Sequence, residues 1–488
     1  MSAGGDRFDY DLIVIGAGPV GENVADYATK RGLHVAVVES ELVGGECSYW
    51  ACMPSKALLR SGHALRTARR LAGAREAVTG TIDAAAVLAR RTGFTDGWSD
   101  AGQVSWLDSA GIDLLRGHGR LVGRQTVEVG DREYRARAVA LATGSVPVLP
   151  PIPGLDSVSA WGTQEATAAD HVPASLIVVG GGVAGVELAF AFSSLGSRVT
   201  LLSRGALLER EESFVGDLVA AALSEEGVDV RWGSAPARVA RDRDGTVTVT
   251  LGDDTAIRAE EILVSTGRRP NTDHLGLETV GLETVGLGTA GLGTAGSGAR
   301  RTELVVDETM LVSGTDWLYA VGDVNGRALL THQGKYQARA AGEAIAARLQ
   351  GTALHDGPWG AHVATADHGA VPRVVFSDPE VAAVGLTERA AREQGMPVRA
   401  VEYDLGWVAG AKLHADGYAG RAKLVVDESR GVVVGATFVG QDVAELLHSA
   451  TIAIVGEVPV ERLWHAVPAY PTISEIWLRL LETYGRPD

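Results

Sequence analysis

Two segments of this chain share one order of elements, and this repeat constrains the fold more than any other feature. In the first, an apolar stretch at 11–15 leads into Gly16, Gly18 and Gly21, and the next apolar stretch ends at Glu39. Glycines at this spacing let the backbone approach a pyrophosphate, and a following helix N-terminus favours its charge. An acid after the second strand can bind an adenosine ribose. The pattern predicts a Rossmann-like dinucleotide site; a tight turn without ligand is the alternative.

The second segment repeats the strand, the glycine turn and the helix from residue 176 onward. Its second strand ends at Leu202 without an acid, and Arg204 and Arg210 stand there instead. An acid selects a free ribose 2′-hydroxyl, whereas arginines select a 2′-phosphate. The segment therefore predicts NADPH, with NADH less favoured, unless the two arginines only form a solvated face. The glycines of this turn are Gly180, Gly182 and Gly185.

The only two cysteines, Cys47 and Cys52, have four residues between them. This spacing fits neither a zinc site, which needs further ligands, nor a thioredoxin-type pair. On a regular helix they would be about 7.5 Å apart along the axis, so a bridge requires an irregular backbone. We expect Cys47 in a loop and Cys52 at the N-terminus of a helix with Pro54 in its first turn, where a thiolate is stabilised. The pair predicts a redox-active centre; two inert thiols are the alternative.

Composition and charge limit the classes of binding partner and the cellular compartment that we expect for this chain. Lys and Arg number 44 against 61 Asp and Glu, and a net charge of −17 disfavours nucleic acid and anionic membranes. No apolar run reaches the roughly 18 residues of a transmembrane helix. The first apolar run follows acidic residues and ends in glycines, so it is expected to be a strand, not a signal peptide. We therefore expect a cytoplasmic protein, in which a cysteine pair is more often catalytic than structural.

The rest of the chain carries weaker patterns. A strand at 139–145 is followed by several prolines, which mark a boundary, and another strand ends in Gly322-Asp323. That aspartate suits a polyol hydroxyl or simply a turn. Five-residue repeats fill 276–298, where frequent glycines disfavour a helix. From about Pro372 the pattern predicts a separate α+β domain.

Together these motifs resemble the flavoprotein pyridine nucleotide-disulfide oxidoreductases, which include dihydrolipoamide dehydrogenase, glutathione reductase and mercuric reductase. The motifs occur in the family's order over nearly the whole chain. The resemblance implies an α/β fold with two Rossmann-like dinucleotide-binding domains and a C-terminal α+β dimerisation domain, acting as a homodimer. The implied parts are an FAD-binding domain at 1–153 and 300–358, an NAD(P)H-binding domain at 154–275 and an interface domain at 359–488. The repeats at 276–299 lie outside the resemblance, and their composition predicts a low-complexity surface loop.

The resemblance also implies roles for single residues. Electrons would pass from NADPH through FAD to a Cys47–Cys52 disulfide. Cys52 would face the flavin as the thiolate, and Cys47 would attack the substrate. The first glycine turn and Glu39 would bind FAD, and no metal is implied. Further implied cofactor contacts are Gly45, Thr143, Gly144, Gly267, Gly322 and Asp323, and Lys56 with Glu187 would form an ion pair beside the flavin.

One departure from the family concerns the catalytic acid/base. The family has a histidine just before Pro-Thr-x-Ser-Glu, paired with that glutamate; here the position is Tyr470, and Glu475 remains. A tyrosine, with a reference pKa of about 10, is not a base near neutrality. His465 could substitute for it or be an ordinary structural histidine.

A second departure adjoins the cysteines, where Glu46, Tyr49 and Trp50 replace smaller or amide residues. The aromatic pair could stack on a planar substrate or fill a cleft. Three hypotheses follow. The preferred one is an NADPH-dependent FAD reductase that acts through the disulfide on an unknown acceptor. The second is a quinone or soft-metal-ion reductase with little disulfide turnover, and the third is a flavoprotein retained as a binding or sensing module.

Overall fold

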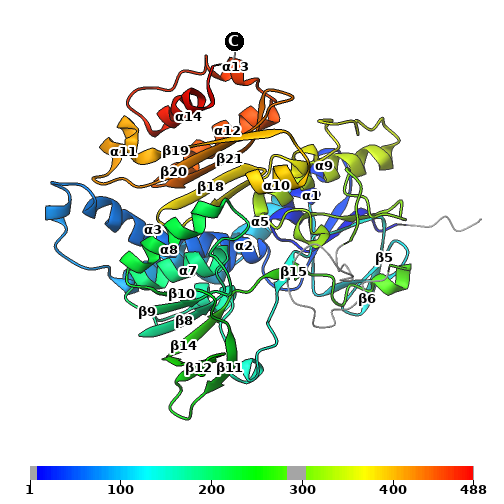
Figure 1. Cartoon of the computed structure of the whole chain (residues 1–488). Helices are drawn as coiled ribbons and strands as arrows, with labels where there is room; N and C mark the ends of the chain where they lie inside the picture. Colours follow the sequence, from blue (N-terminus) through cyan, green and yellow to red (C-terminus); the bar gives the residue numbers. More distant parts are fainter. Residues whose placement is uncertain (1–7, 283–303, 487–488) are drawn as a thin grey trace, which may run out of the picture. The chain divides into compact units, whose positions relative to one another are not determined.

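The computed structural model describes residues 8–282 and 304–486 (Figure 1). The chain forms two compact units, each built from three separate segments. Unit 1 comprises 1–54, 92–150 and 267–367, and unit 2 comprises 55–91, 151–266 and 368–488.

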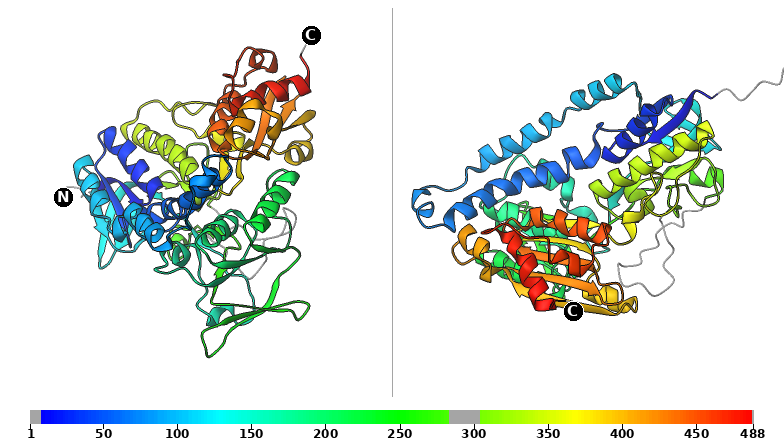
Figure 2. Two further views of the ribbon diagram at one scale, coloured as in Figure 1. Left: turned by 90° about the vertical axis from the view of Figure 1, so that its left-hand side faces the viewer. Right: turned by 90° about the horizontal axis from the view of Figure 1, so that it is seen from above.

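Unit 1 is built on a seven-stranded sheet in the order β3-β2-β1-β6-β5-β4, with β16 added beside β6. Strand β1 is buried on both faces, as expected of a central parallel strand. One face packs against α1 (Pro19–Lys30) and α9 (Thr331–Gln350), which lie side by side in Figures 1 and 2. The strands are β1 Tyr10–Ile15, β2 Val35–Glu39, β3 Asp113–Arg116, β4 Gly119–Gly123, β5 Thr126–Val129, β6 Arg132–Leu141 and β16 Leu318–Ala320.

Unit 2 contains a second parallel sheet, in the order β10-β9-β8-β14. Helix α7 (Val183–Ser194) packs against it and is apolar around most of its circumference, which explains why eight consecutive residues from Gly185 to Phe192 are buried. A small antiparallel sheet of β11 Pro236–Arg241, β12 Val247–Leu251 and β13 Ala256–Ala259 adjoins it in sequence. The parallel strands are β8 Ser175–Val179, β9 Arg198–Leu202, β10 Asp229–Arg231 and β14 Glu261–Val264.

The C-terminal part of unit 2 is a five-stranded antiparallel sheet in the order β17-β18-β21-β20-β19. Helices α12 (Leu447–Val455) and α14 (Ile476–Tyr484) pack on it. The expected fold class, with two Rossmann-like sheets and a C-terminal α+β part, is therefore confirmed. The strands are β17 Pro372–Val375, β18 Glu380–Gly385, β19 Val398–Asp404, β20 Arg421–Asp427 and β21 Val432–Gly440.

The start of the predicted low-complexity loop differs from a surface loop. Residues Leu277–Val280 form a 3₁₀ turn, η4, and Leu277 is only 1% exposed in the apolar core of unit 1. The backbone N–H of Leu121 donates to the carbonyl of Leu275, which anchors this segment to β4. The packing of Leu277 in the core thus explains why the segment folds against unit 1 up to residue 282 although it is rich in glycine. The remainder of the predicted loop lies outside the described residues.

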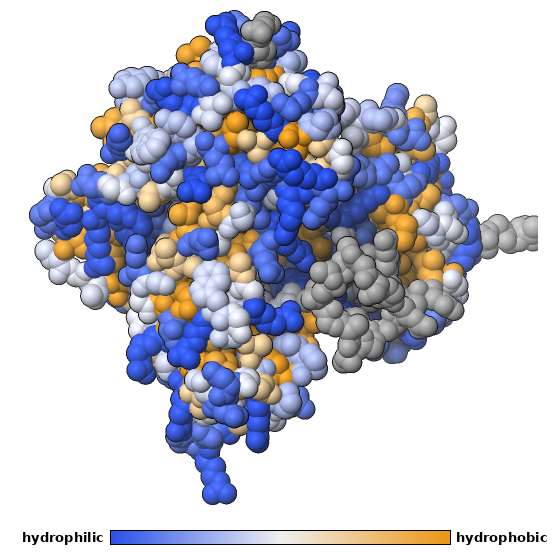
Figure 3. Space-filling view, viewed as in Figure 1, coloured by the Kyte–Doolittle hydropathy of each residue, from blue (hydrophilic) through white to orange (hydrophobic). Residues whose placement is uncertain are grey.

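In the part of the chain that the structure describes, no helix combines the length and the apolar character needed to cross a bilayer. Large apolar side chains do reach the surface of unit 2. Figure 3 shows such patches on the part drawn at the top, which holds the C-terminal sheet. The most exposed large apolar residues of this part are Trp407, Leu413, Ile452, Val467 and Tyr470.

Candidate functional site

The two cysteines lie on consecutive helices. Helix α3 (Cys52–Arg69) begins at Cys52, which confirms the expected position of this residue at a helix N-terminus. The prediction of a loop around Cys47 is wrong, because Cys47 lies in a short helix, α2 (Gly45–Tyr49). Left-handed Gly44 begins this helix, and the N–H groups of Trp50 and Ala51 both donate to the Glu46 carbonyl, at 2.7 Å each. The backbone then breaks at Trp50, with φ −136° and ψ −2°.

Both cysteines are free thiols in this structure, and they contact each other. The hydrogen bond between Cys47 and Cys52 raises the pKa of Cys47 well above its ordinary value, and burial raises it further. Thr331, the first residue of α9, has its hydroxyl 3.5 Å from the Cys52 sulfur. Its hydrogen bond to Cys47 acts in the opposite direction and lowers the pKa of that thiol.

The first glycine turn connects β1 to α1 through tight backbone contacts. Gly16 has φ +100°, and a Cβ on it would lie 2.5 Å from the carbonyl oxygen of Ala142. A Cβ on Gly21 would lie 1.8 Å from the Gly16 oxygen, and one on Gly45 would lie 2.7 Å from the Cα of Gly18. Gly18 caps α1 without any side-chain hydrogen bond, so no side chain of the cap occupies the first amides of the helix. This uncapped cradle of glycine backbone fits the pyrophosphate of a dinucleotide.

Glu39 is fixed where β2 ends. One carboxylate oxygen accepts a hydrogen bond of 2.8 Å from the N–H of Ala17, inside the glycine turn. The other accepts one of 2.8 Å from the N–H of Glu41. The turn therefore orients the carboxylate that the sequence assigned to a ribose.

A polar chain runs from Glu46, the neighbour of Cys47, to Asp323. Arg268 forms an ion pair with Glu46 and donates from Nε to the Ser145 hydroxyl at 2.8 Å. That hydroxyl donates to Oδ2 of Asp323 at 2.6 Å. Burial raises the pKa of the carboxyl groups of both Glu46 and Asp323, and Arg268 partly opposes the effect.

The segments of Thr143 and Gly267 fold against each other within unit 1. The Thr143 hydroxyl donates to the Asn271 carbonyl at 2.6 Å, and the Asn271 N–H donates to the carbonyl of Gly144 at 3.0 Å. Gly144 and Gly267 both have positive φ, +72° and +133°, which permits these turns. The paired strands here are β7 Ser145–Pro147 and β15 Arg268–Pro270.

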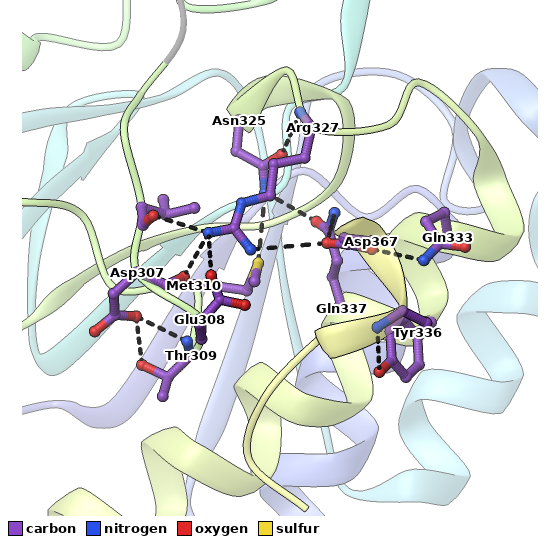
Figure 4. A network of polar contacts seen from close by, with 12 residues as sticks. Asp307, Glu308, Thr309, Met310, Asn325, Arg327, Gln333, Tyr336, Gln337 and Asp367 are labelled. Atoms are coloured by element: carbon purple, nitrogen blue, oxygen red, sulfur yellow. Dashed lines mark hydrogen bonds and ion pairs between the residues drawn. The ribbon is translucent and has the colours of Figure 1, made fainter. Parts of the chain in front are cut away.

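The turn that carries Gly322 and Asp323, η5 (Gly322–Asn325), is held by amide side chains (Figure 4). The Gly322 N–H donates to Oε1 of Gln337 at 2.8 Å, and Asn325 donates to the same oxygen at 2.8 Å. Gln337 in turn donates to Asp367 at 2.9 Å, and Gln333 donates to the other Asp367 oxygen at 2.6 Å. These partners could not be predicted from the sequence, because glutamines on a helix match no motif.

Lys56 and Glu187 form an ion pair within unit 2, with 2.7 Å between Nζ and Oε2. Glu187 is only 3% exposed, and its other oxygen accepts a hydrogen bond of 2.9 Å from the N–H of Phe376. The Lys56 ammonium also lies 5.0 Å from the centroid of the Phe376 ring. Both carboxylate oxygens are therefore paired, as a buried charge requires.

The second glycine turn repeats the geometry of the first. Gly180 has φ +125°, and a Cβ on Gly185 would lie 2.0 Å from the Gly180 oxygen. Gly182 caps α7 without a side-chain hydrogen bond. Arg204 and Arg210, which follow β9, are exposed, and among the described residues neither has an ion-pair partner.

The structure does not bring Tyr470 and Glu475 together by a hydrogen bond. Tyr470 is 76% exposed, follows a loop and precedes a cis bond to Pro471; within 8–282 and 304–486 its hydroxyl has no partner. Glu475 is 7% exposed and accepts a hydrogen bond of 3.3 Å from the N–H of Gly410. His465 is exposed on the surface of unit 2.

Tyr49 is not available for stacking on a substrate. It is 4% exposed, and its hydroxyl donates to the carbonyl of Val43 at 3.0 Å. The ring fills the interior of unit 1, so the stacking alternative does not apply to Tyr49. Trp50 is half-buried beside it, with 5.8 Å between the two ring centroids.

Comparison with known proteins agrees with this architecture. The family model described as pyridine nucleotide-disulphide oxidoreductase matches residues 10–348, and the model of the corresponding dimerisation domain matches 371–480. The chain is 31% identical to a dihydrolipoyl dehydrogenase of Geobacillus stearothermophilus, over 99% of this chain and 97% of that protein. It is 32% identical to a mercuric reductase of Acidithiobacillus ferrooxidans, over 99% and 84%.

A solved structure has the same fold. The HOCl-induced flavoprotein disulfide reductase RclA from Escherichia coli superposes with a TM-score of 0.80 at 24% identity, covering 97% of this chain and 99% of that one. From the family models and the sequence relatives we conclude that the chain belongs to the pyridine nucleotide-disulphide oxidoreductase family of flavoproteins.

Proposed function

We propose that this protein is an FAD-dependent oxidoreductase that takes electrons from NADPH and passes them through a Cys47–Cys52 disulfide to an acceptor. The contact between the two sulfur-bearing side chains carries this proposal. Two electrons and one proton convert the disulfide into a Cys52 thiolate and a Cys47 thiol. The raised pKa of Cys47 supports this division of roles. Cys52, at the N-terminus of α3, is where a helix stabilises negative charge.

The residues of unit 1 are suited to hold FAD. The uncapped amides after Gly18 would bind the diphosphate, Glu39 the adenosine ribose, and Asp323 a hydroxyl of the ribityl chain. Bound FAD would supply a two-electron carrier between the nicotinamide and the cysteine pair. In unit 2, the uncapped start of α7 would bind the NADPH diphosphate, and Arg204 and Arg210 its 2′-phosphate.

The class of electron acceptor depends on whether the protein has a general acid near the cysteine pair. Reduction of a disulfide substrate releases a thiolate that is best protonated by an acid of matched pKa. Tyr470 stands where the family has histidine and is exposed, without a hydrogen-bond partner in the described part of the chain. This favours acceptors that need no general acid, such as quinones, oxidised dyes or soft metal ions. The similarity to a mercuric reductase supports the metal ions among these.

The dimerisation-domain match and the exposed apolar side chains of unit 2 support a homodimer. The net charge of −17 gives no support to a nucleic-acid partner.

An acceptor panel tests this proposal. Oxidation of NADPH and of NADH is followed with lipoamide, glutathione disulfide, quinones and soft metal ions. Wild type should prefer NADPH and reduce quinones or metal ions faster than either disulfide. Tyr470→His should gain disulfide turnover, and Tyr470→Phe should not. Fast lipoamide turnover by wild type would contradict the restricted acceptor range, and no NADPH oxidation with any acceptor would favour a binding or sensing module.

A further inference from the structure

Several metal-ligating side chains meet in unit 2, and the proposed function uses none of them. His63 comes from α3, Glu380 begins β18, and Asp442 follows β21. One ligand atom from each of the three lies within 4.8 Å of the other two. A fourth side chain, His414 at the end of α11 (Ala409–His414), has its Nε2 2.8 Å from Oδ2 of Asp442. The Nε2 of His63 lies 3.8 Å from the other oxygen, Oδ1.

One donor of this cluster lacks a hydrogen-bond partner, and its two carboxylates lack a lysine or arginine partner among the described residues. The Nε2 atom of His63 is buried and, among the described residues, has no hydrogen-bond partner. Glu380 is 8% exposed, and one of its oxygens accepts a hydrogen bond of 3.0 Å from the N–H of Ala444. Within the described ranges neither Glu380 nor Asp442 has an ion pair with lysine or arginine. Buried carboxylates are usually paired, protonated or bound to a metal, and Glu380 is the buried carboxylate of this cluster.

Three arginines of α3 lie near His63 in sequence, and in the described part of the chain none forms an ion pair with Glu380 or Asp442: Arg60 is exposed, and Arg66 and Arg70 bind another carboxylate. Arg66 lies 2.6 Å from one oxygen of Asp378, and Arg70 lies 2.7 Å from the other. Both guanidinium groups are thus occupied by a different carboxylate. Asp378 and Glu445 add further negative charge around Glu380.

We propose that His63, Glu380 and Asp442 bind one divalent first-row transition-metal ion of the Zn²⁺ type. Imidazole and carboxylate donors together suit Zn²⁺, Ni²⁺ and Cu²⁺ better than Mg²⁺ or Ca²⁺. In a tetrahedral site, bonds of about 2.0–2.2 Å place ligand atoms roughly 3.3–3.6 Å apart, so each of the three donors, now within 4.8 Å of one another, would move inward by up to about 1 Å. Three protein ligands leave one position for water.

His414 would act as a positioning residue in this site. Contacts to the far side of a ligating carboxylate orient it toward the metal, and their loss typically weakens binding by about 10- to 100-fold. His414 already lies against the Asp442 oxygen that is farther from His63. The ion would join α3 to β18 and to the segment after β21, and metal binding would therefore stabilise unit 2.

The test uses the FAD-loaded full chain with Cys47→Ser and Cys52→Ser, because thiols also bind these metals. Zn²⁺ is added in isothermal titration calorimetry, and Co²⁺ is followed by its visible absorption. One ion should bind per chain and raise the unfolding temperature. His63→Gln and Asp442→Asn should abolish binding or weaken it by more than about 100-fold, and His414→Gln by about 10- to 100-fold. The matched control is His448→Gln, which removes an exposed histidine of unit 2 and should bind like the parent.

The proposal is overturned if the parent takes up no stoichiometric Zn²⁺, or if His63→Gln and Asp442→Asn bind it as the parent does. The Asp442 side chain is 46% exposed, so the asparagine variant should keep its circular dichroism and its FAD even if the buried His63 variant does not. Because the parent protein lacks both thiols, the result of this metal-binding test does not depend on whether the proposed electron path is correct.

Discussion

Thr331 is the residue that links the two thiols to the body of unit 1. Its hydroxyl lies 3.5 Å from the Cys52 sulfur, and its hydrogen bond to Cys47 lowers the pKa of that thiol. In Thr331→Val the pKa of Cys47 should therefore rise. One hydrogen bond is worth about 0.5–1.5 kcal/mol, so alkylation of Cys47 at fixed pH should slow by roughly two- to tenfold. The rate is measured over pH in a Cys52→Ser background, in which only Cys47 reacts.

Thr331→Ser is the matched control, because it keeps the hydroxyl and should retain the alkylation profile. Equal rates in the valine and serine variants would show that the hydroxyl does not influence the thiol.

The Lys56–Glu187 pair makes a prediction about stability. Lys56→Met leaves the Glu187 carboxylate, 3% exposed, with only the N–H of Phe376 as partner. Breaking a fully buried pair costs about 3–5 kcal/mol, and the 33% exposure of the Lys56 side chain reduces this to roughly 1–3 kcal/mol. Urea unfolding measures the loss. Adding Glu187→Gln should recover part of it, and strictly additive effects of the two changes would contradict a direct interaction.

At the scale of elements, we propose that the end of β9 determines the choice of nicotinamide cofactor. Arg204 and Arg210 follow this strand and are exposed, whereas Arg198 is exposed at its opposite end. Changing Arg204 and Arg210 to Gln should raise the KM for NADPH by about 10- to 100-fold per residue, because each removes a charge-assisted contact with the 2′-phosphate. The KM for NADH should stay nearly constant.

Arg198→Gln provides the control for the general loss of a positive charge, and it should leave both KM values unchanged. If the KM values for NADPH and NADH rise equally in the arginine variants, the two arginines do not bind the 2′-phosphate.

The elements around both glycine turns could be predicted from sequence because their signals are local. The apolar stretch at 11–15 became β1, which starts one residue earlier, and the strand expected to end at Leu202 became β9. Helix α2 could not be predicted, because five residues carry no helical periodicity and its start depends on left-handed Gly44. The left-handed conformation of Gly44 is a property of the folded backbone and cannot be predicted from composition.

The side-chain network of unit 1 was also beyond sequence reasoning. Gln337 and Asp367 hold the turn of Gly322 from elsewhere in the chain, and Thr331 reaches Cys52 across 279 positions. Such contacts appear only when the fold brings the segments together. The sequence could identify the cysteines and the glycines, but not the residues that orient them.

At the scale of the whole molecule, the exposed apolar side chains of unit 2 predict a dimer. Val467 is 85% exposed and Leu413 is 69% exposed. A charge placed in such an interface is costly, so Leu413→Glu and Val467→Glu should raise the dimer dissociation constant by at least about tenfold. Sedimentation equilibrium measures this constant. Leu149→Glu, at a 63% exposed position of unit 1, is the control, and an equal effect there would contradict the assignment of the interface.

The central claim is that reducing equivalents are stored on Cys47 and Cys52 as well as on FAD. Anaerobic titration with NADPH tests it most directly, with the Cys47→Ser variant as control. The wild-type protein should consume two two-electron equivalents and develop a long-wavelength absorption band from a thiolate beside the flavin, whereas the variant should consume one. A wild-type protein that is fully reduced by a single equivalent would contradict the proposed electron path.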